Sequence, residues 1–192
     1  MLVYHRKKLK IEPFFRYEPW KITEETFNSK NNLRNESIFS TGNGYMGVRG
    51  NLEEDYTGPL ESSIPGVYIN GVYASEQIIY GEVAPHQPEK SQTILNLANW
   101  LKINLYIDGE KFDMFKGKIE GYRRELNLKE GVLRRSLIWT SPSKKRLSID
   151  IERFVSFTDV HTGLIRYNIK ALNFQGNVKL VSEIDGNARN YI

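Results

Sequence analysis

Apolar and polar residues alternate with a period of two along the second half of the chain. Leu101, Ile103, Leu105 and Ile107 share one face of the first such segment, and polar residues occupy the other. This alternation is typical of a half-buried β-strand. The pattern recurs about every ten residues. It predicts further strands at residues 110–115, 122–128, 132–140, 146–157, 164–172 and 178–184.

Short turn-forming segments separate these strands. Asp108-Gly109 tolerates the positive φ angles of a type I′ turn, and Glu130-Gly131, residues 141–143 and residues 173–177 provide the later turns. Connections this short join neighbouring antiparallel strands. The chain is therefore predicted to be all-β, an antiparallel β-sandwich or barrel with largely up-and-down connections.

The strand at 146–157 illustrates the expected burial. One face is apolar, with Arg153 as its lone charged residue, and comprises Leu147, Ile149, Ile151, Val155 and Phe157. If such faces meet in one apolar layer, Leu101, Ile149 and Leu180 are shielded from water.

The first 95 residues are less regular. Long loops are expected there, with a short helix beginning at residues 23–26 and a strand between glycines at residues 66–73. Gly42 to Gly47 spells G-x-G-x-x-G, the pattern of dinucleotide-binding loops. That pattern requires a strand before it and a helix after it, but residues 48–51 contain poor helix formers and no apolar stripe. A glycine-shaped β-turn is the favoured interpretation.

The bulk composition is that of one globular domain over residues 1–192. The chain is 40% apolar and 26% charged, with a net charge of +4 spread along its length. The densest basic runs, residues 6–8 and 144–146, fall in a terminus and a turn, so no nucleic-acid partner is predicted. No apolar run approaches the roughly 20 residues that span a bilayer, so no membrane partner is predicted either. The absence of cysteine and of a secretory leader favours the cytoplasm.

Cleavage of a glycosidic bond needs a carboxylic acid to protonate the leaving oxygen and a nucleophile on the opposite face. Glu53-Glu54-Asp55 is expected in a polar loop exposed to water, and Asp150 and Glu152 alternate outward from a strand. Solvated carboxylates of this kind are far commoner than catalytic ones. No residue is therefore assigned a catalytic role.

The histidines and aromatic residues give weaker signals. His5, His86 and His161 are too widely spaced to predict a metal site. Tyr68 and Tyr73 lie near the glycine-rich loops and are the candidates for substrate binding, because tyrosines stack on sugar rings. Packing in the core or at a sheet edge is the other interpretation of both residues.

Several segments, in this order and spacing, resemble the N-terminal domain of glycoside hydrolase family 65. They are the glycine-rich run at 35–54, then residues 95–100, 122–133, 153–156 and 172–176, and Asp185-Gly186-Asn187. The resemblance implies a large antiparallel β-sandwich of the galactose mutarotase-like kind, attached in full-length members to an (α/α)6 barrel. Most members are disaccharide phosphorylases. In these, inorganic phosphate attacks the anomeric carbon of an α-glucoside and a glutamic acid protonates the leaving sugar, giving β-glucose 1-phosphate with inversion.

The resemblance also implies what residues 1–192 do. The family's catalytic glutamate and phosphate-binding residues lie in the barrel, which this sequence does not contain, so the chain is expected to be inactive alone. Its sandwich is expected to be incomplete at the C-terminal end. The expected partners are the protein's own barrel and a second subunit, with inorganic phosphate as co-substrate of the full-length enzyme and no cofactor. The alternative is a free-standing carbohydrate-binding module.

Overall fold

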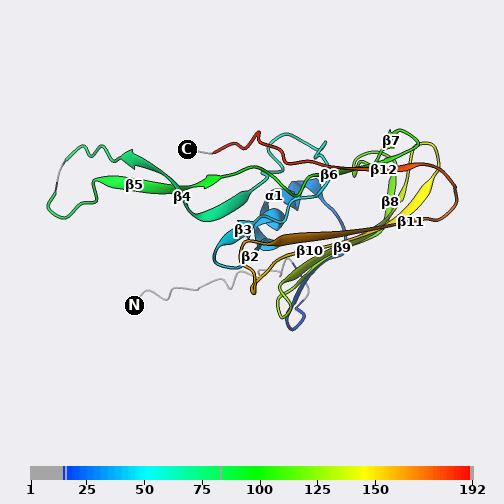
Figure 1. Ribbon diagram of the computed structural model, residues 1–192, viewed down its shortest axis with the longest axis horizontal. Coiled ribbons are helices and arrows are strands. Elements are labelled where there is room, and N and C mark those ends of the chain that lie inside the picture. The colour runs from blue at the N-terminus through cyan, green and yellow to red at the C-terminus, as the bar shows by residue number, and fades with distance from the viewer. Residues whose placement is uncertain (1–14, 16, 83, 191–192) are drawn as a thin grey trace, which may run out of the picture.

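The computed structural model describes residues 15, 17–82 and 84–190 (Figure 1). Its largest sheet is antiparallel, with strand order β1-β8-β9-β10-β11. These strands are β1 (Lys21–Glu24), β8 (Lys118–Asn127), β9 (Val132–Thr140), β10 (Arg146–Val155) and β11 (Gly163–Ala171). The last four run up and down in chain order, as the alternation predicted.

A smaller sheet packs against one face of the large one. It has the order β12-β6-β7, from β12 (Val178–Ser182), β6 (Ile103–Ile107) and β7 (Glu110–Lys111). Asp108 (φ 47°) and Gly109 (φ 84°) both adopt the left-handed conformation in the β6–β7 turn, which confirms the predicted hairpin. Figure 1 shows the two sheets as separate layers.

The core lies between these two layers. Leu105 and Ile107 from the small sheet meet Trp139, Leu147 and Ile149 from the large one, and all five side chains are fully buried. Each buried aliphatic side chain stabilises the fold by about 1.5–3 kcal/mol relative to exposure. The predicted all-β sandwich is confirmed.

Two residues expected in this core lie elsewhere. Leu180 is 45% exposed. It pairs with Leu105 across the strands, but β12 is the outer strand of its sheet and the described chain does not cover that margin. Phe157 is 69% exposed because β10 ends at Val155, so the alternation no longer applies to it.

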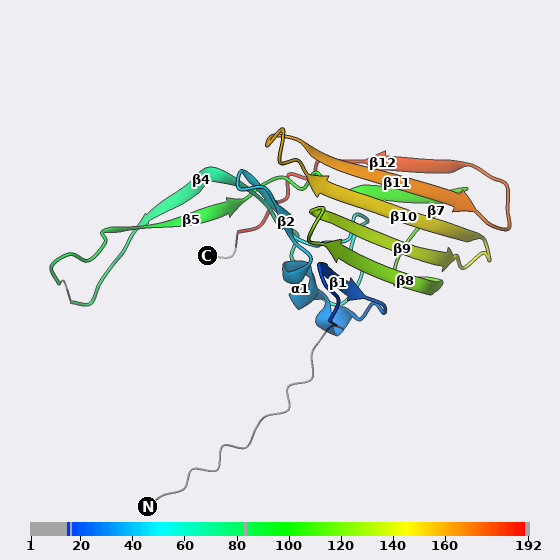
Figure 2. The same ribbon diagram turned by 90° about the horizontal axis from the view of Figure 1, so that it is seen from below.

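The third sheet has the order β2-β3-β4-β5, with β2 (Thr41–Gly42), β3 (Met46–Val48), β4 (Val67–Gln77) and β5 (Lys90–Asn96). The predicted strand at 66–73 is thus confirmed as part of β4. The β2–β3 hairpin confirms the glycine-shaped turn, since Gly44 has φ 88° and Asn43 Oδ1 accepts from the Met46 amide at 2.8 Å. The outer parts of β4 and β5 project from the sandwich (Figure 2).

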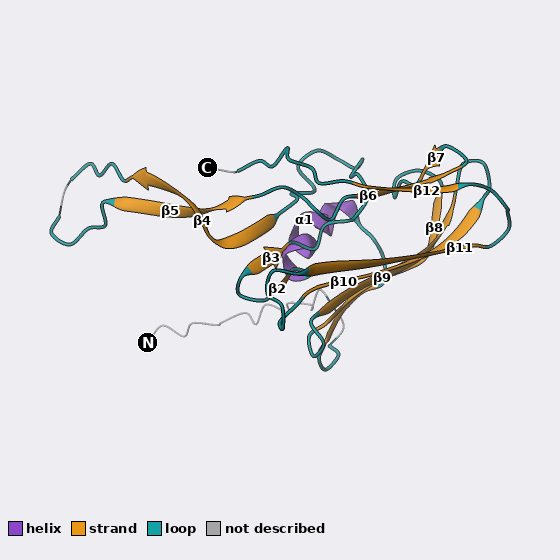
Figure 3. Ribbon diagram, viewed as in Figure 1, coloured by secondary structure: helices purple, strands orange, loops and turns teal. Residues whose placement is uncertain are grey.

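The predicted helix at 23–26 is wrong. Thr23 belongs to β1, and the helix of the described residues, α1 (Ser29–Ile38), begins after Asn28, whose Oδ1 accepts from the Lys30 amide at 3.0 Å (Figure 3). The buried side chains of α1 are polar, namely Asn32, Asn35 and Glu36. This helix is short of apolar residues, and no helix among the described residues is long and apolar enough to cross a membrane.

Candidate functional site

Three arginines on adjacent strands point into the sandwich. Arg124 on β8, Arg135 on β9 and Arg153 on β10 are each exposed by 4% or less. They occupy the inward face that elsewhere carries apolar residues, and Arg124 lies directly opposite Arg135. Buried guanidinium groups require ionic and hydrogen-bonding partners.

Glutamates from the N-terminal third of the chain supply those partners. Glu53 binds Arg135 at 2.7 Å and Arg153 at 3.0 Å, and Glu54 also binds Arg135. Glu24 binds Arg124 at 2.7 Å. The expectation that Glu53 and Glu54 face water is therefore wrong, because both carboxylates are buried against arginines that lie about 80–100 residues later. Nor is Arg153 a lone charge.

The same arginines hold the backbone of the glycine-rich segment. Arg124 Nη1 donates to the Gly50 carbonyl and Arg153 Nη2 to the Arg49 carbonyl, each at 2.9 Å. Gly50 lies so close to Phe39 that an added Cβ would stand 2.7 Å from the Phe39 Cβ. A glycine is therefore required where this segment passes the helix end.

The network extends from Glu24 and Glu36 into α1 and the following loop. Glu24 accepts from Asn35 at 2.6 Å and from the Tyr122 hydroxyl at 3.2 Å. Glu36 accepts from Ser63 Oγ at 2.5 Å and from the Ile64 amide at 2.9 Å. Helix, glycine-rich segment and large sheet are thus joined by one set of ion pairs and hydrogen bonds, which we call the arginine–glutamate network.

Burial and charge oppose each other at these positions. Burial alone lowers the pKa of Arg135, but Glu54 and Glu53 raise that pKa above its ordinary value. The pKa of Arg153 is lowered, because its burial outweighs the attraction of Glu53 and the neighbouring Arg135 repels it. Burial raises the pKa of Tyr122, so its hydroxyl stays protonated and donates to Glu24.

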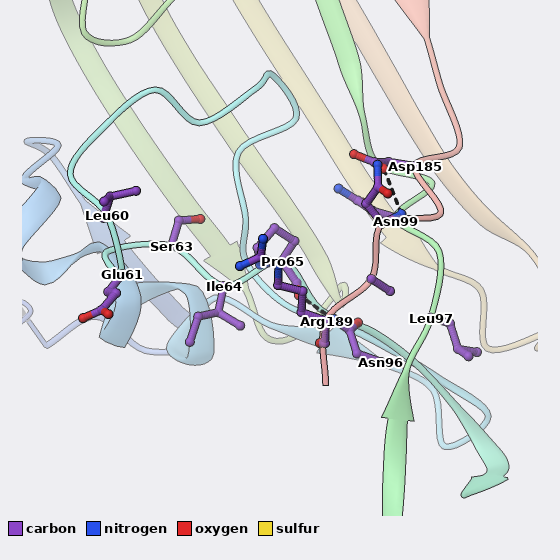
Figure 4. Close-up of a pocket in the computed structure, with 12 residues that line it drawn as sticks. Leu60, Glu61, Ser63, Ile64, Pro65, Asn96, Leu97, Asn99, Asp185 and Arg189 are labelled. Atoms are coloured by element: carbon purple, nitrogen blue, oxygen red, sulfur yellow. Dashed lines mark hydrogen bonds between the residues drawn. The ribbon is translucent and has the colours of Figure 1, made fainter. Parts of the chain in front are cut away.

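A pocket of about 490 Å³ opens beside this network (Figure 4). Three segments form it, namely the loop before β4, the segment after β5 and the C-terminal segment. Its lining residues are Leu60, Glu61, Ser63, Ile64, Pro65, Asn96, Leu97, Asn99, Asp185, Asn187, Ala188 and Arg189. Its wall at Ser63 and Ile64 is fixed by Glu36, so the network also shapes the pocket.

Asn96 joins the three segments. Its Nδ2 donates to the carbonyls of Pro65 at 2.9 Å and Arg189 at 3.1 Å, and its Oδ1 accepts from the Val67 amide at 2.9 Å. With all three bonds made, this amide has little capacity left for a ligand. At this pocket the Asn96 side chain therefore holds chain segments together and is not free to bind a small molecule.

Tyr68 and Tyr73 do not line this pocket. Tyr68 lies on β4 opposite Gly47 and Asn96, and its ring stands close to Gly66. Tyr73 lies beyond a register irregularity of β4, is 43% exposed and donates to Asn70 Oδ1 at 2.7 Å. Their role in substrate binding stays a prediction.

Asp150 and Glu152 lie on the outer face of the large sheet, as predicted. Glu152 binds Arg134 at 2.8 Å and also Arg166, and these residues border a shallow hollow of about 270 Å³. The two arginines lower the pKa of Glu152, first through the hydrogen bond from Arg134. A lowered pKa is the opposite of what a general acid needs at neutral pH.

No metal site was predicted from the sequence because its three histidines are widely spaced. His5 lies outside the described residues. His86 is in the loop between β4 and β5 with φ 69°, and the His161 ring contacts the Tyr45 ring at 4.3 Å between centroids. Within residues 15, 17–82 and 84–190, no three histidine, aspartate or glutamate side chains are grouped to hold a metal ion.

The arginine–glutamate network was not predicted from the sequence. A signal was present, since Arg124, Arg135 and Arg153 all fall in phase with the apolar residues of their strands. Arginine in phase with a buried face requires a buried partner. The pattern does not say which acidic residues supply it.

The sequence of this chain is similar to those of known proteins. Residues 22–191 match the family model described as glycosyl hydrolase family 65, N-terminal domain. The chain is 42% identical over 179 residues to an α,α-trehalose phosphorylase of Thermoanaerobacter brockii, covering 93% of this chain and 23% of the relative. It is 39% identical over 176 residues to a maltose phosphorylase of Bacillus subtilis, covering 92% and 23% respectively.

A solved structure shares the fold. It is described as "Putative kojibiose phosphorylase from human microbiome", with a TM-score of 0.75 and 26% identity over 87% of this chain and 22% of that one. The chain thus spans about a quarter of the length of the proteins it matches. By sequence and by fold, this chain belongs to glycosyl hydrolase family 65, of which it represents the N-terminal domain.

Proposed function

We propose that this domain is the non-catalytic scaffold of a disaccharide phosphorylase, an enzyme that uses inorganic phosphate to cleave an α-linked glucose disaccharide and releases β-glucose 1-phosphate. The family membership carries the proposal, supported by matched relatives that are described as trehalose, maltose and kojibiose phosphorylases. The domain would support a catalytic part of the protein, and a cytoplasmic location stays the prediction made from sequence.

The use of the buried carboxylates agrees with this role. Glu53 and Glu54 are bound by arginines of the large sheet and Glu24 by Arg124, so these acids serve the fold. A catalytic acid must instead reach the leaving oxygen of a substrate.

A chimera tests the proposal. In the Thermoanaerobacter brockii trehalose phosphorylase, the segment that matches this chain would be replaced by this chain, and phosphate consumption with trehalose would be measured. We expect activity in the chimera and none in the isolated chain with trehalose, maltose or kojibiose. The relative lacking the matched segment is the control and should be inactive. Phosphorolysis by the isolated chain, or a folded chimera without activity, would overturn the proposal.

Sugar titration examines the carbohydrate-binding alternative. Calorimetry of the isolated chain with glucose, maltose and trehalose should show no saturable heat if the domain is a scaffold. Saturable heat that disappears in Tyr68→Ala or Tyr73→Ala would favour a binding module, since aromatic rings supply the stacking surface for sugars.

A further inference from the structure

Two Asn-Gly dipeptides occur in the chain, Asn43-Gly44 and Asn70-Gly71. In such a dipeptide the backbone nitrogen of the glycine can attack the side-chain amide carbon of the asparagine, because glycine has no side chain to hinder the approach. The attack closes a succinimide ring. Both glycines have positive φ, 88° for Gly44 and 94° for Gly71, so the conformation of the glycine does not distinguish the two dipeptides. Their asparagine side chains do.

Four hydrogen bonds hold the side chain of Asn43. Its Oδ1 accepts from the backbone amides of Tyr45 at 3.0 Å and Met46 at 2.8 Å. Its Nδ2 donates to the backbone carbonyls of Ser156 at 2.6 Å and Val160 at 3.0 Å. The side chain thus fastens the β2–β3 turn to the turn after β10. Ring closure here would break these bonds, including both that hold the nitrogen that must leave.

The surroundings of Asn70-Gly71 are open. Both residues are exposed, and a Cβ added to Gly71 would meet no heavy atom within 4 Å beyond its chain neighbours. The pairing of β4 is also interrupted here, since its register with β3 ends at Ile69 and its register with β5 is irregular between Tyr68 and Tyr73. The backbone at Gly71 can therefore rotate towards the Asn70 side chain with little loss of strand pairing.

Tyr73 contributes a hydrogen-bond donor to this dipeptide. Its hydroxyl donates to Asn70 Oδ1 at 2.7 Å. Negative charge develops on this oxygen when the Gly71 nitrogen attacks, and a donor already in place stabilises that charge. Among the described residues, Asn70 Nδ2 has no hydrogen-bond partner, so nothing holds the leaving nitrogen.

We propose that Asn70 is a self-modification site, at which Gly71 attacks the Asn70 amide with assistance from the Tyr73 hydroxyl. A bond forms between the Gly71 nitrogen and Asn70 Cγ, and the bond from Cγ to Nδ2 breaks. The hydrogen of the Gly71 nitrogen leaves with the amide group as ammonia. Water then opens the succinimide at either carbonyl and gives aspartate or isoaspartate. The reaction consumes only water and does not depend on the activity proposed above.

Either product changes β4 where it leaves the third sheet. Aspartate places a negative charge beside the Tyr73 hydroxyl. Isoaspartate inserts the side-chain methylene into the main chain, between Ile69, the last residue paired with β3, and Tyr73, where regular pairing with β5 begins. The modification therefore lengthens the strand between its two partners.

Peptide mapping by mass spectrometry tests the proposal on the folded chain during prolonged incubation. Deamidation replaces NH2 by OH, which changes the mass of the peptide, and chromatography separates the isoaspartyl form. We expect conversion at Asn70 to be about tenfold faster than at Asn43 or more, since Asn43 must lose several hydrogen bonds. The chain unfolded in guanidinium chloride is the control, and there the two dipeptides should react at similar rates.

Substitutions test the roles of the two neighbours. Gly71→Ala hinders the attack and should suppress conversion at Asn70. Tyr73→Phe keeps the ring, removes the hydroxyl, and should slow conversion by roughly two- to tenfold in the folded chain only. Tyr68→Phe on the same strand is the matched control and should leave the rate unchanged.

Two results would overturn the proposal, namely an Asn70 that stays unmodified in the folded chain and equal conversion at Asn43 and Asn70. Conversion of the folded Tyr73→Phe chain at the native rate would overturn the assistance assigned to the hydroxyl.

Discussion

Polar groups are paired differently in the sandwich interior and in the β4–β5 arm, which comprises the outer parts of β4 and β5 at residues 71–77 and 90–95. In the interior, the charges of Arg124, Arg135 and Arg153 are each matched by a glutamate within 3.0 Å. In the arm, polar side chains are mostly uncharged, and the outer backbone edges have no strand partner among the described residues. The buried charges of the interior are therefore paired within the described chain, whereas the outer edges of the arm are not.

This difference determines how much free energy of unfolding is lost when a charged side chain is replaced in each region. Removing one partner of a buried ion pair leaves an uncompensated charge in a medium of low polarity. Removing a side chain from the solvated arm leaves nothing buried. Substitutions of the same kind should therefore have very different effects in the two regions.

The largest effect is expected for Glu53→Gln. It removes the charge that Arg135 and Arg153 share, and should lower the free energy of unfolding by about 3–5 kcal/mol. Urea unfolding followed by circular dichroism measures it. The matched control, Glu76→Gln on the arm, should change that value by less than about 0.5 kcal/mol. Equal effects of the two substitutions would refute the contrast between the regions.

A smaller loss of unfolding free energy is expected when the Asp113 carboxylate is removed. Burial raises its pKa, but hydrogen bonds from Thr57 Oγ1 at 2.6 Å and the Phe115 amide at 2.8 Å, with Lys116 nearby, lower the pKa overall. A lowered folded-state pKa stabilises the protein above the unfolded value of about 3.9, and this stabilisation is lost as the pH falls through the folded value.

Asp113→Asn should therefore cost about 1.5 kcal/mol at pH 7, the contribution of hydrogen bonds to a charged group. The cost should shrink between pH 4 and pH 2 as the native carboxylate becomes protonated. Unfolding curves at several pH values check this. A cost that stays constant down to pH 2 would contradict the assignment of the stabilisation to the charged form.

The smallest effect is expected from a pair of glycine substitutions. Gly109 (φ 84°) lies in the β6–β7 turn of the sandwich, and Gly71 (φ 94°) lies at the base of the arm. Gly109→Ala should lower the free energy of unfolding by about 1 kcal/mol, the cost of a left-handed alanine. Gly71→Ala should leave global unfolding unchanged and instead make residues 71–95 more sensitive to protease. Global destabilisation by Gly71→Ala would show that the arm unfolds with the sandwich.

The meander β8–β11 could be predicted because each strand buries one apolar face and tight turns separate the strands. The helix α1 could not, because the face that it buries is polar and carries no 3.6-residue apolar period. β5 could not be predicted either, since KSQTILN does not alternate. Local patterns identify elements that bury hydrocarbon, and overlook those held by polar contacts.

The candidate site was less predictable for a related reason. Glu53-Glu54-Asp55 has the composition of a solvated loop, and only the distant arginines make its first two residues buried. The pocket depends on Asn96 holding three segments together, which requires contacts with residues as far away as Arg189. Pairings over such separations leave no periodicity in the sequence.

The arginine–glutamate network has a consequence for synthesis on the ribosome. Glu53 and Glu54 emerge 81 to 100 residues before the arginines that neutralise them. At the usual 5–20 residues per second of translation, the arginines that bind these glutamates are synthesised about 4–20 s later. During that interval the nascent N-terminal third should remain hydrated and unfolded, and docking should be complete only when β10 leaves the exit tunnel.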